Sequence, residues 1–270
     1  MKKLKDLLYG ISIERIVGAT SISIQAVEFD SRKIKPGSLF VAQNGYNTDG
    51  HLYIDNAEQQ GAVAIICEQL PKNFKAEVVY VQVEDASKAL GQLSSNFYDH
   101  PSQKLKLIGI TGTNGKTTVA SLLYGLFEAL GHPCGLISTV KMAYLNQERP
   151  ATHTTPNAVE INQFLAELVN KGVTHCFMEV SSHGIAQGRI EGLTFTGGIF
   201  TNLTHEHLDY HGDFKTYRDT KKHFFDLLPP QAFALTNLDD KNGEYMLQNT
   251  KAKTLTYALK HHADYKVHLL

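Results

Sequence analysis

The sequence has no excess of either charge, few cysteines and no long apolar run. Lysine plus arginine number 26 and aspartate plus glutamate 27 among 270 residues, which leaves a formal net charge of −1. This balance gives no overall electrostatic reason to bind nucleic acid or an anionic membrane. No stretch approaches the roughly 20 apolar residues that span a bilayer, and no small-residue cleavage site follows the N-terminal lysines. We therefore predict a soluble, cytoplasmic protein.

The cysteines and the N-terminal residues give two further expectations. Cys67, Cys134 and Cys176 are odd in number, widely spaced and flanked by apolar residues. This arrangement is typical of reduced core thiols and does not indicate a disulfide framework or a metal site. In residues 1–18 the apolar positions are interrupted by charged side chains, which predicts a short amphipathic helix.

Apolar runs of strand length alternate with helical patterns along the chain, without long repeats or low-complexity segments. The sequence predicts strands within residues 38–43, 61–68, 77–83, 104–111, 134–139, 174–181, 196–203, 232–238 and 252–259, and helices within 85–98, 116–130, 157–171 and 214–228. This alternation requires right-handed crossovers, so the predicted fold class is α/β with a mainly parallel sheet. A proline-containing polar stretch at 98–103 predicts a small α/β domain, 1–100, and a larger domain, 101–270.

The segment LIGITGTNGKTTV, residues 107–119, is close to a phosphate-binding loop but has Ile110 where the common motif has its first glycine. It lies between a strand pattern and a helical pattern, where bare backbone amides and a helix N-terminus attract phosphate oxygens. Lys116 would reach the β and γ phosphates, and a threonine hydroxyl would bind magnesium. The candidate nucleotide-binding residues are Gly112, Thr113, Asn114, Gly115, Lys116, Thr117 and Thr118. The alternative is a tight turn that binds nothing.

Two downstream residues have positions suited to metal or amine chemistry. Glu179 ends an apolar strand, at the edge where open parallel sheets bind ligands, and its oxygens suit magnesium. A helix cap or an ion-pair partner is the alternative role. Lys221 lies near the centre of the apolar face of helix 214–228, which predicts a desolvated amine with a lowered pKa, whereas Lys222 falls outside that face. A lysine that extends to the surface is the alternative.

Three histidines, His205, His207 and His211, follow another apolar strand. Common zinc sites place two histidines on one helix face or add cysteine ligands, and this spacing does neither. The histidine-rich segment therefore does not predict a zinc centre.

Several long motifs, taken together and in order, resemble those of the Mur ligases, the ATP-dependent amide-forming enzymes of peptidoglycan synthesis. They are FDSRKIKPGSLFVAQNGYNTDGHLYI at 29–54, TGTNGKTT at 111–118, HTTP at 153–156, MEVSSHGIAQGRI at 178–190, TNLTHEHLDYHGDF at 201–214 and YRDTK at 217–221. The resemblance covers essentially the whole chain and is strongest to the tripeptide-forming branch of the family. It implies ATP and Mg²⁺ as cofactors, and addition of meso-diaminopimelate or L-lysine to UDP-N-acetylmuramoyl-L-alanyl-D-glutamate through an acyl phosphate.

The same resemblance implies roles for individual residues. Catalysis falls to Lys116, Glu179, His207 and a carbamylated Lys221, and the magnesium ligands are Thr117, Glu179, His207 and the carbamate of Lys221. The residues implied in binding the uridine nucleotide, in an N-terminal UDP-binding domain, are Phe29, Ser31, Tyr46, Asn47 and Thr48. Those matching the positions that hold the UDP-muramoyl-dipeptide are His153, which stands where an asparagine is frequent, Thr154, Thr155, Ser181, Gln187 and Arg189.

Complete ligases of this type have a third, C-terminal domain that binds the incoming amino acid, and this sequence ends before it. We therefore expect an incomplete central domain and no complete ligation by these residues alone. Two alternatives stay open: a folylpolyglutamate-type ligase, whose family lacks the N-terminal UDP-binding segment, and a non-catalytic nucleotide-binding module. The expected partners are the UDP-N-acetylmuramoyl-dipeptide and a diamino acid, bound by a monomer without nucleic acid or membrane.

Overall fold

The computed structural model describes residues 1–45, 48–206 and 208–266, and the chain divides into two compact units. The first unit contains Met1–His100 together with Ala158–Gln163 and Gly188–Leu193. The second unit contains Pro101–Asn157, Phe164–Gln187 and Thr194–Leu270. The predicted α/β class with mainly parallel pairing is confirmed.

The first unit, within its described residues, contains a five-stranded sheet in the order β2-β7-β6-β5-β4. Its strands are β2 (Ile13–Val17), β4 (Ala26–Glu28), β5 (Ser38–Ala42), β6 (Ala62–Cys67) and β7 (Val79–Val83), and its helices are α1 (Leu4–Leu7), α2 (Ile54–Gln59) and α3 (Ala86–Phe97). A separate antiparallel pair consists of β1 (Lys2–Lys3) and β3 (Ser23–Ile24). Strands β4, β5, β6 and β7 are parallel, whereas β2 pairs antiparallel with β7.

Strand β5 explains why this sheet needs helices on both faces. All of its residues are buried. Leu39 and Val41 belong to one hydrophobic cluster, with residues of α1 and α3, whereas Phe40 and Ala42 belong to a second cluster with residues of α2. Because successive side chains of a strand point to opposite faces, a continuous apolar run requires cover on each side.

The prediction of a helix within residues 1–18 is wrong for most of that segment. Only Leu4–Leu7 are helical, and Ile13–Val17 form β2, which pairs with β7. Gly10 has a φ of 77°, a left-handed conformation that turns the chain between the two elements. The β-branched residues after this turn pair with the edge of the sheet, so tertiary pairing overrides the short helical pattern.

The second unit, within its described residues, contains nine strands in the order β11-β10-β9-β12-β8-β13-β14-β15-β16. They are β8 (Lys106–Thr111), β9 (Cys134–Ile137), β10 (Lys141–Tyr144), β11 (Gln147–Pro150), β12 (His175–Glu179), β13 (Gly197–Phe200), β14 (Phe233–Asn237), β15 (Lys253–Ala258) and β16 (Tyr265–Lys266). The helices are α4 (Lys116–Ala129), α5 (Ala158–Asn170), whose first residues belong to the other unit, α6 (Ser182–Ala186), α7 (Leu208–His211), α8 (Phe214–Asp226) and α9 (Gly243–Leu247).

Most of the second sheet is parallel, as the sequence predicts. The parallel strands are β9, β12, β8, β13, β14, β15 and β16. The antiparallel hairpin β10–β11, which continues the sheet beyond β9, was not predicted. Each strand segment and each long helix that the sequence predicts is present in the structure. Among the described residues, no helix combines the length and the apolar character needed to cross a membrane.

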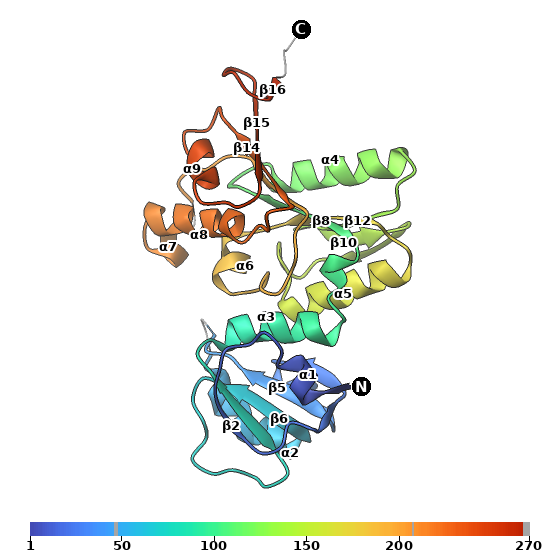
Figure 1. The fold of residues 1–270 in the computed structure, drawn as a ribbon, viewed down its shortest axis with the longest axis vertical. Coiled ribbons are helices and arrows are strands. Elements are labelled where there is room, and N and C mark those ends of the chain that lie inside the picture. Colours follow the sequence, from blue (N-terminus) through green and yellow to red (C-terminus); the bar gives the residue numbers. More distant parts are fainter. Residues whose placement is uncertain (46–47, 207, 267–270) are drawn as a thin grey trace. The chain divides into compact units, whose positions relative to one another are not determined.

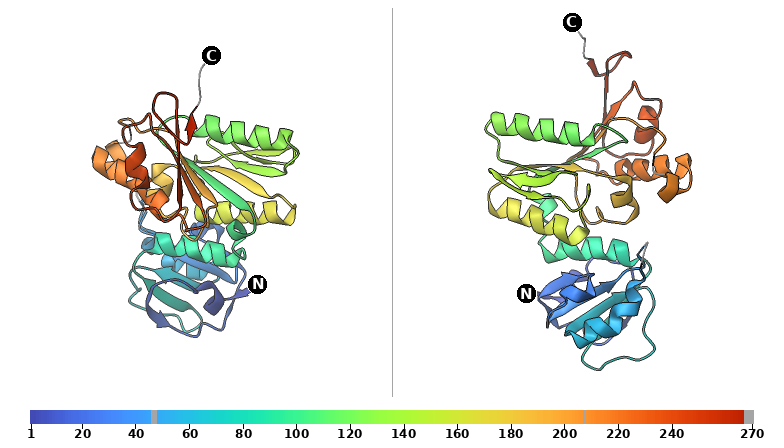
Figure 2. Two further views of the ribbon diagram at one scale, coloured as in Figure 1. Left: turned by 45° about the horizontal axis from the view of Figure 1, so that its top comes forward. Right: turned by 180° about the vertical axis from the view of Figure 1, so that it is seen from behind.

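Helices α4 and α8 pack against opposite faces of this sheet at β8. Ile108 and Ile110 cluster with Leu123 of α4. Gly109, between them, faces the other side, where an added Cβ would lie 2.5 Å from the ring of Phe224 on α8. Figures 1 and 2 show α4 on one side of the β8 and β12 ribbons and α5 on the other. Because β12 and β13 pair parallel with β8, all three strands end at the same edge of the sheet. The turn from β8 into α4 lies at that carboxyl edge.

Candidate functional site

Two glycines shape the turn between β8 and α4. Gly112 has a φ of 145° and Gly115, directly before α4, has a φ of 85°, conformations that other residues disfavour. A Cβ on Gly112 would lie 2.0 Å from Oγ1 of Thr201. That hydroxyl donates to the carbonyl of Asn114 at 2.7 Å, and the side-chain oxygen of Asn202 accepts from the Asn114 amide at 3.0 Å. Two residues directly after β13 thus fix the loop, and neither was predicted from the sequence to have a role.

Lys116 begins α4 and folds back over this loop. Its Nζ donates to the carbonyl oxygens of Gly112 at 2.9 Å and Thr113 at 2.8 Å. Burial lowers the pKa of Lys116, and the negative charges of Glu179 and Glu206 partly oppose that shift. The amine therefore lies beside the backbone amides of a helix N-terminus, an arrangement that can bind phosphate oxygens.

Lys221 reaches the same carbonyl from α8. Its side chain is 1% exposed, and its Nζ donates to the Gly112 oxygen at 3.0 Å. Burial lowers the pKa of Lys221 well below the usual value, the nearby charge of Lys116 lowers it further, and Glu206 opposes the shift. The prediction that this lysine is desolvated is confirmed. Two lysine amines thus share one backbone oxygen in a buried setting.

Glu179 ends β12 and is fully buried. Its Oε2 accepts from the hydroxyl of Thr117, on the first turn of α4, at 3.0 Å. Thr139, which follows β9, donates twice to this carboxylate: its amide to Oε1 at 2.7 Å and its hydroxyl to Oε2 at 3.1 Å. A carboxylate and a hydroxyl side by side are oxygen donors of the kind that Mg²⁺ prefers.

A second contact joins α8 to the loop one helical turn before Lys221. The hydroxyl of Tyr217 lies 3.1 Å from Oγ1 of Thr113, which also accepts from the amide of Thr204 at 2.9 Å. The ammonium group of Lys221 lies 4.8 Å from the centre of the Tyr217 ring. The loop, α8 and the segment after β13 therefore meet at one threonine.

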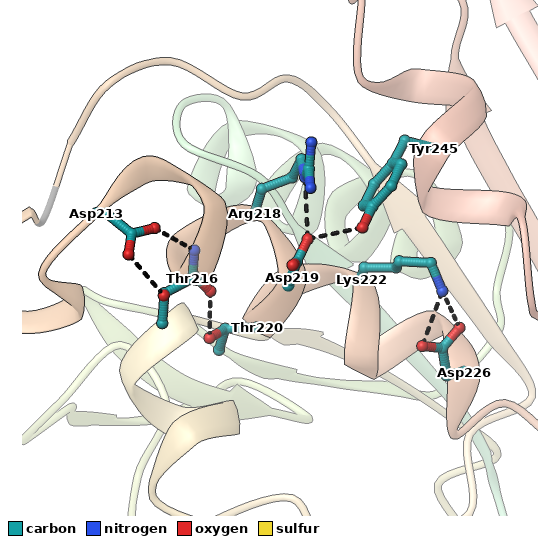
Figure 3. A network of polar contacts seen from close by, with 8 residues as sticks. All are labelled: Asp213, Thr216, Arg218, Asp219, Thr220, Lys222, Asp226 and Tyr245. Atoms are coloured by element: carbon teal, nitrogen blue, oxygen red, sulfur yellow. Dashed lines mark hydrogen bonds and ion pairs between the residues drawn. The ribbon is translucent and has the colours of Figure 1, made fainter.

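A separate polar network runs along α8 and reaches Tyr245 on α9, as Figure 3 shows. Asp219 accepts from Nε of Arg218 at 3.0 Å and from the hydroxyl of Tyr245 on α9 at 2.8 Å. Lys222 donates to both carboxylate oxygens of Asp226, at 2.6 and 2.9 Å. Lys222 is only 5% exposed, so it is buried beside Asp226 although the sequence places it outside the apolar face of Lys221. The ion pair with Asp226 allows this burial, because it satisfies the ammonium group.

Of the three histidines after β13, His205 and His211 are described, and each lies against an aromatic ring. His205 stacks on Phe214, with ring centroids 4.4 Å apart, and His211 lies 5.3 Å from Tyr217. His207, the predicted magnesium ligand, lies outside the described residues. In the part of the chain that is described, no group of three or more histidine, cysteine, aspartate or glutamate side chains forms a metal centre.

Two predicted substrate residues lie beside the end of β12. Thr155 Oγ1 donates to the backbone carbonyl of Glu179 at 2.9 Å and accepts from the amide of Ser181 at 2.9 Å. Ser181 in turn caps α6 through the amide of Gly184 at 3.0 Å. This part of the predicted substrate set is therefore built around the same strand end as the carboxylate.

The other predicted binding residues between positions 101 and 270 do not share these contacts. Gln187 donates to the hydroxyl of Tyr210 at 3.2 Å. His153 and Thr118 are exposed. Arg189 belongs to the first unit, so its role beside the others stays a prediction.

The first unit contains a pocket of about 530 Å³ that includes three of the predicted uridine-binding residues, Phe29, Ser31 and Thr48. Its other lining residues are Asp30, Arg32, Phe40, Gln43, Gly45, Gly50 and Tyr53. Arg32 pairs with Asp30 through Nε at 2.9 Å and Nη2 at 2.8 Å. Tyr46 and Asn47, predicted for the same site, lie outside the described residues. Aromatic rings and paired charges in one pocket are typical of a polar small-molecule site.

Comparison with known proteins identifies the family. The model of the Mur ligase middle domain matches residues 110–269, and that of the Mur ligase family catalytic domain matches residues 23–98. The chain belongs to the Mur ligase family. In this Mur ligase family member, the glycine loop before α4 and Glu179 lie in the region that the middle-domain model matches, and the pocket residues lie in the region that the other model matches.

Curated relatives and solved structures agree with this family. The chain is 52% identical over 269 residues to the UDP-N-acetylmuramoyl-L-alanyl-D-glutamate–2,6-diaminopimelate ligase of Cytophaga hutchinsonii, and 50% identical over 269 residues to that of Bacteroides fragilis. Each match covers 99% of this chain and 55% of the relative, so the chain spans about half the length of these relatives.

Among solved structures, a ligase of the same description superposes with a TM-score of 0.83 at 28% identity, over 98% of this chain and 54% of the other. The MurF ligase of Thermotoga maritima, described in complex with ADP, shares the fold with a TM-score of 0.56 at 20% identity, over 89% of this chain and 51% of the other. The mixed α/β fold with mainly parallel pairing is therefore that of the Mur ligases.

Proposed function

We propose that this chain forms the ATP-binding and UDP-substrate-binding part of a ligase that adds meso-diaminopimelate to UDP-N-acetylmuramoyl-L-alanyl-D-glutamate. The observation that carries the proposal is the convergence of Lys116 and Lys221 on the carbonyl of Gly112, beside the Thr117–Glu179 pair. Transfer of the γ-phosphoryl group of ATP to a carboxylate brings two anions together. Such a reaction needs cations held in place near both anions. L-Lysine is the alternative amino acid.

The loop amides and Lys116 would bind the β and γ phosphates of ATP. The hydroxyl of Thr117 and the carboxylate of Glu179, 3.0 Å apart, fit Mg²⁺ as oxygen donors, and His207 is proposed as a further ligand. Bound Mg²⁺ would neutralise charge on the phosphates. The substrate carboxylate then attacks the γ-phosphorus and releases ADP, which leaves an acyl phosphate. The amine of the diamino acid attacks the acyl carbon, loses a proton and expels phosphate.

Lys221 is proposed to become a carbamate. A neutral amine attacks the carbon of CO₂ and loses a proton, so that the cation is replaced by an anionic carboxylate on nitrogen. Burial and the charge of Lys116 both lower the pKa of Lys221, which favours the neutral amine that this addition requires. The new carboxylate would provide oxygen donors for a second Mg²⁺, which would offset negative charge on the phosphate and the substrate.

The pocket of the first unit is the proposed site of the UDP group. Phe29 and Tyr53 offer aromatic surfaces, and Ser31 and Thr48 offer hydroxyls. The roles of Tyr46, Asn47, Thr154, Gln187 and Arg189 rest on the family resemblance. Diaminopimelate is proposed as the amino acid because the relatives near 50% identity are named as diaminopimelate ligases. The reaction is assigned to the cytoplasm, where ATP and UDP-linked precursors are available.

A turnover assay tests the proposed function. The chain is mixed with the part of the Cytophaga hutchinsonii relative that the match to this chain does not cover. ATP, Mg²⁺, the UDP-linked dipeptide and either diaminopimelate or lysine are then added. We expect ADP release coupled to tripeptide formation with diaminopimelate, and hydroxylamine should trap the acyl phosphate as a hydroxamate. ATP consumption with a folate, and none with the UDP-linked dipeptide, would instead support the folylpolyglutamate alternative.

A further inference from the structure

Thr139 lies at the end of β9, the strand next to β12, and no role in the reaction was assigned to it from the sequence. Its amide and hydroxyl both donate to Glu179, at 2.7 and 3.1 Å. The two bonds go to different carboxylate oxygens, which fixes the rotation of the carboxylate plane as well as its position. Thr139 is exposed whereas Glu179 is fully buried, so the contact reaches the carboxylate from the solvent side of the sheet edge.

The Thr139 hydroxyl has one proton and two neighbouring oxygen atoms, so the donor in each of its hydrogen bonds can be identified. Oγ1 of Thr139 lies 3.1 Å from Oε2 of Glu179 and 3.1 Å from Oγ1 of Thr154. An ionised carboxylate can only accept, so the single hydroxyl proton of Thr139 goes to Glu179. Thr154 is then the donor in the contact between the two threonines. A chain of hydroxyls thus runs from Thr154, a proposed substrate residue, through Thr139 to the carboxylate.

We propose that Thr139 is a positioning residue that aims Glu179 at the metal site beside Thr117. The inference rests on the proposed function, because it assigns Glu179 and Thr117 to Mg²⁺. Metal coordination by the Thr117 oxygen and by Oε2 would change the contact between these two atoms. The two bonds from Thr139, the amide to Oε1 and the hydroxyl to Oε2, hold both oxygens of the carboxylate in place.

The alternative explanation is that Thr139 merely closes the turn between β9 and β10. Ser138 already serves that turn, because its hydroxyl donates to the carbonyl of Lys141 at 2.9 Å and accepts from the amide of Lys141 at 3.1 Å. The Thr139 hydroxyl makes both of its contacts outside the turn. A role in holding the carboxylate therefore accounts for contacts that turn formation does not require.

The test measures metal binding without turnover. Mn²⁺ binding in the presence of ADP is followed by electron paramagnetic resonance for the unchanged chain and for Thr139→Val, Thr139→Ser and Thr174→Val. Thr139→Val keeps the amide but loses the hydroxyl, and we expect its Mn²⁺ affinity to fall about tenfold or more, as residues that orient metal ligands typically show. Thr139→Ser should stay within about twofold of the unchanged chain, since it restores the hydroxyl.

Thr174→Val is the matched control, because this exposed threonine lies directly before β12, at the opposite end of the strand from Glu179. It should leave Mn²⁺ affinity unchanged, and thermal melting of every variant reports on folding. Equal affinity of Thr139→Val and the unchanged chain would overturn the positioning role. A chain that binds ADP but no Mn²⁺ would instead contradict the metal site itself, so the two failures are distinguishable.

Discussion

Replacing Lys221 with methionine should stabilise the folded protein near neutral pH while removing the group proposed to form the carbamate. Methionine has a similar length and no charge, so it fits a site that is 1% exposed. The hydrogen bond from Lys221 to Gly112 is lost, but the carbonyl keeps its bond from Lys116 at 2.9 Å. No buried acceptor is left without a partner, so the main effect is removal of a desolvated amine.

The magnitude follows from proton linkage. Folding lowers the pKa of Lys221 well below 10.5, so between the lowered value and 10.5 the unfolded chain binds more protons than the folded one. Stability of the unchanged chain therefore rises with pH through that window, by up to about 1.4 kcal/mol per pH unit for one proton. The advantage of Lys221→Met is largest below the window and narrows by the same slope as pH approaches 10.5.

Urea denaturation from pH 7 to pH 10, in buffer free of CO₂, measures this difference. Lys222→Met is the control on the neighbouring residue, because it breaks the ion pair with Asp226 and should destabilise the protein by about 1 kcal/mol. We expect the free energy of unfolding to rise at pH 7 for Lys221→Met and to fall for Lys222→Met. A Lys221→Met variant that is less stable than the unchanged chain at pH 7, with a difference independent of pH, would show that burial of the Lys221 amine does not cost stability.

Three other substitutions or reactions test separate contacts. Gly112→Ala should destabilise the protein by more than about 1 kcal/mol in urea titrations, because a Cβ would meet the hydroxyl of Thr201 at 2.0 Å in a left-handed conformation. Tyr217→Phe should lower the free energy of unfolding by about 1 kcal/mol, through loss of the bond to Thr113, and unchanged melting would argue against that bond. Burial raises the pKa of Cys67 to about 12, so a thiol reagent at pH 8 should modify it only after unfolding, and rapid labelling of the folded chain would contradict a core position.

The sequence predicts the parts of the second unit whose signals are local. The strand, glycine turn and helix of residues 104–130 are contiguous, so their order alone predicts the turn between β8 and α4. The periodicity of helix 214–228 likewise predicts that Lys221 is buried. It does not predict that Lys221 shares the Gly112 carbonyl with Lys116, because that contact depends on how α8 packs over Gly109.

Residues supplied by neighbouring strands were missed for the same reason. Thr139, Thr201 and Asn202 follow β9 and β13, which become neighbours of β12 and β8 only in the folded sheet. A signal was present, since polar residues directly after buried parallel strands gather at one edge, but strand order is needed to use it. The N-terminal error has the opposite origin, because a local helical pattern yielded to pairing of Ile13–Val17 with β7.

We propose that one chain holds two ligand sites, a UDP site in the first unit and an ATP site at the loop before α4 in the second. Isothermal titration of UDP-N-acetylmuramoyl-L-alanyl-D-glutamate and of ATP with Mg²⁺ tests this directly, using Lys116→Met and Ser31→Tyr. We predict that Lys116→Met loses ATP and keeps the UDP ligand, and that Ser31→Tyr, whose larger side chain enters the pocket, does the reverse. ATP binding that survives Lys116→Met, or a UDP ligand that does not bind the unchanged chain, would show that the two sites are not placed as proposed.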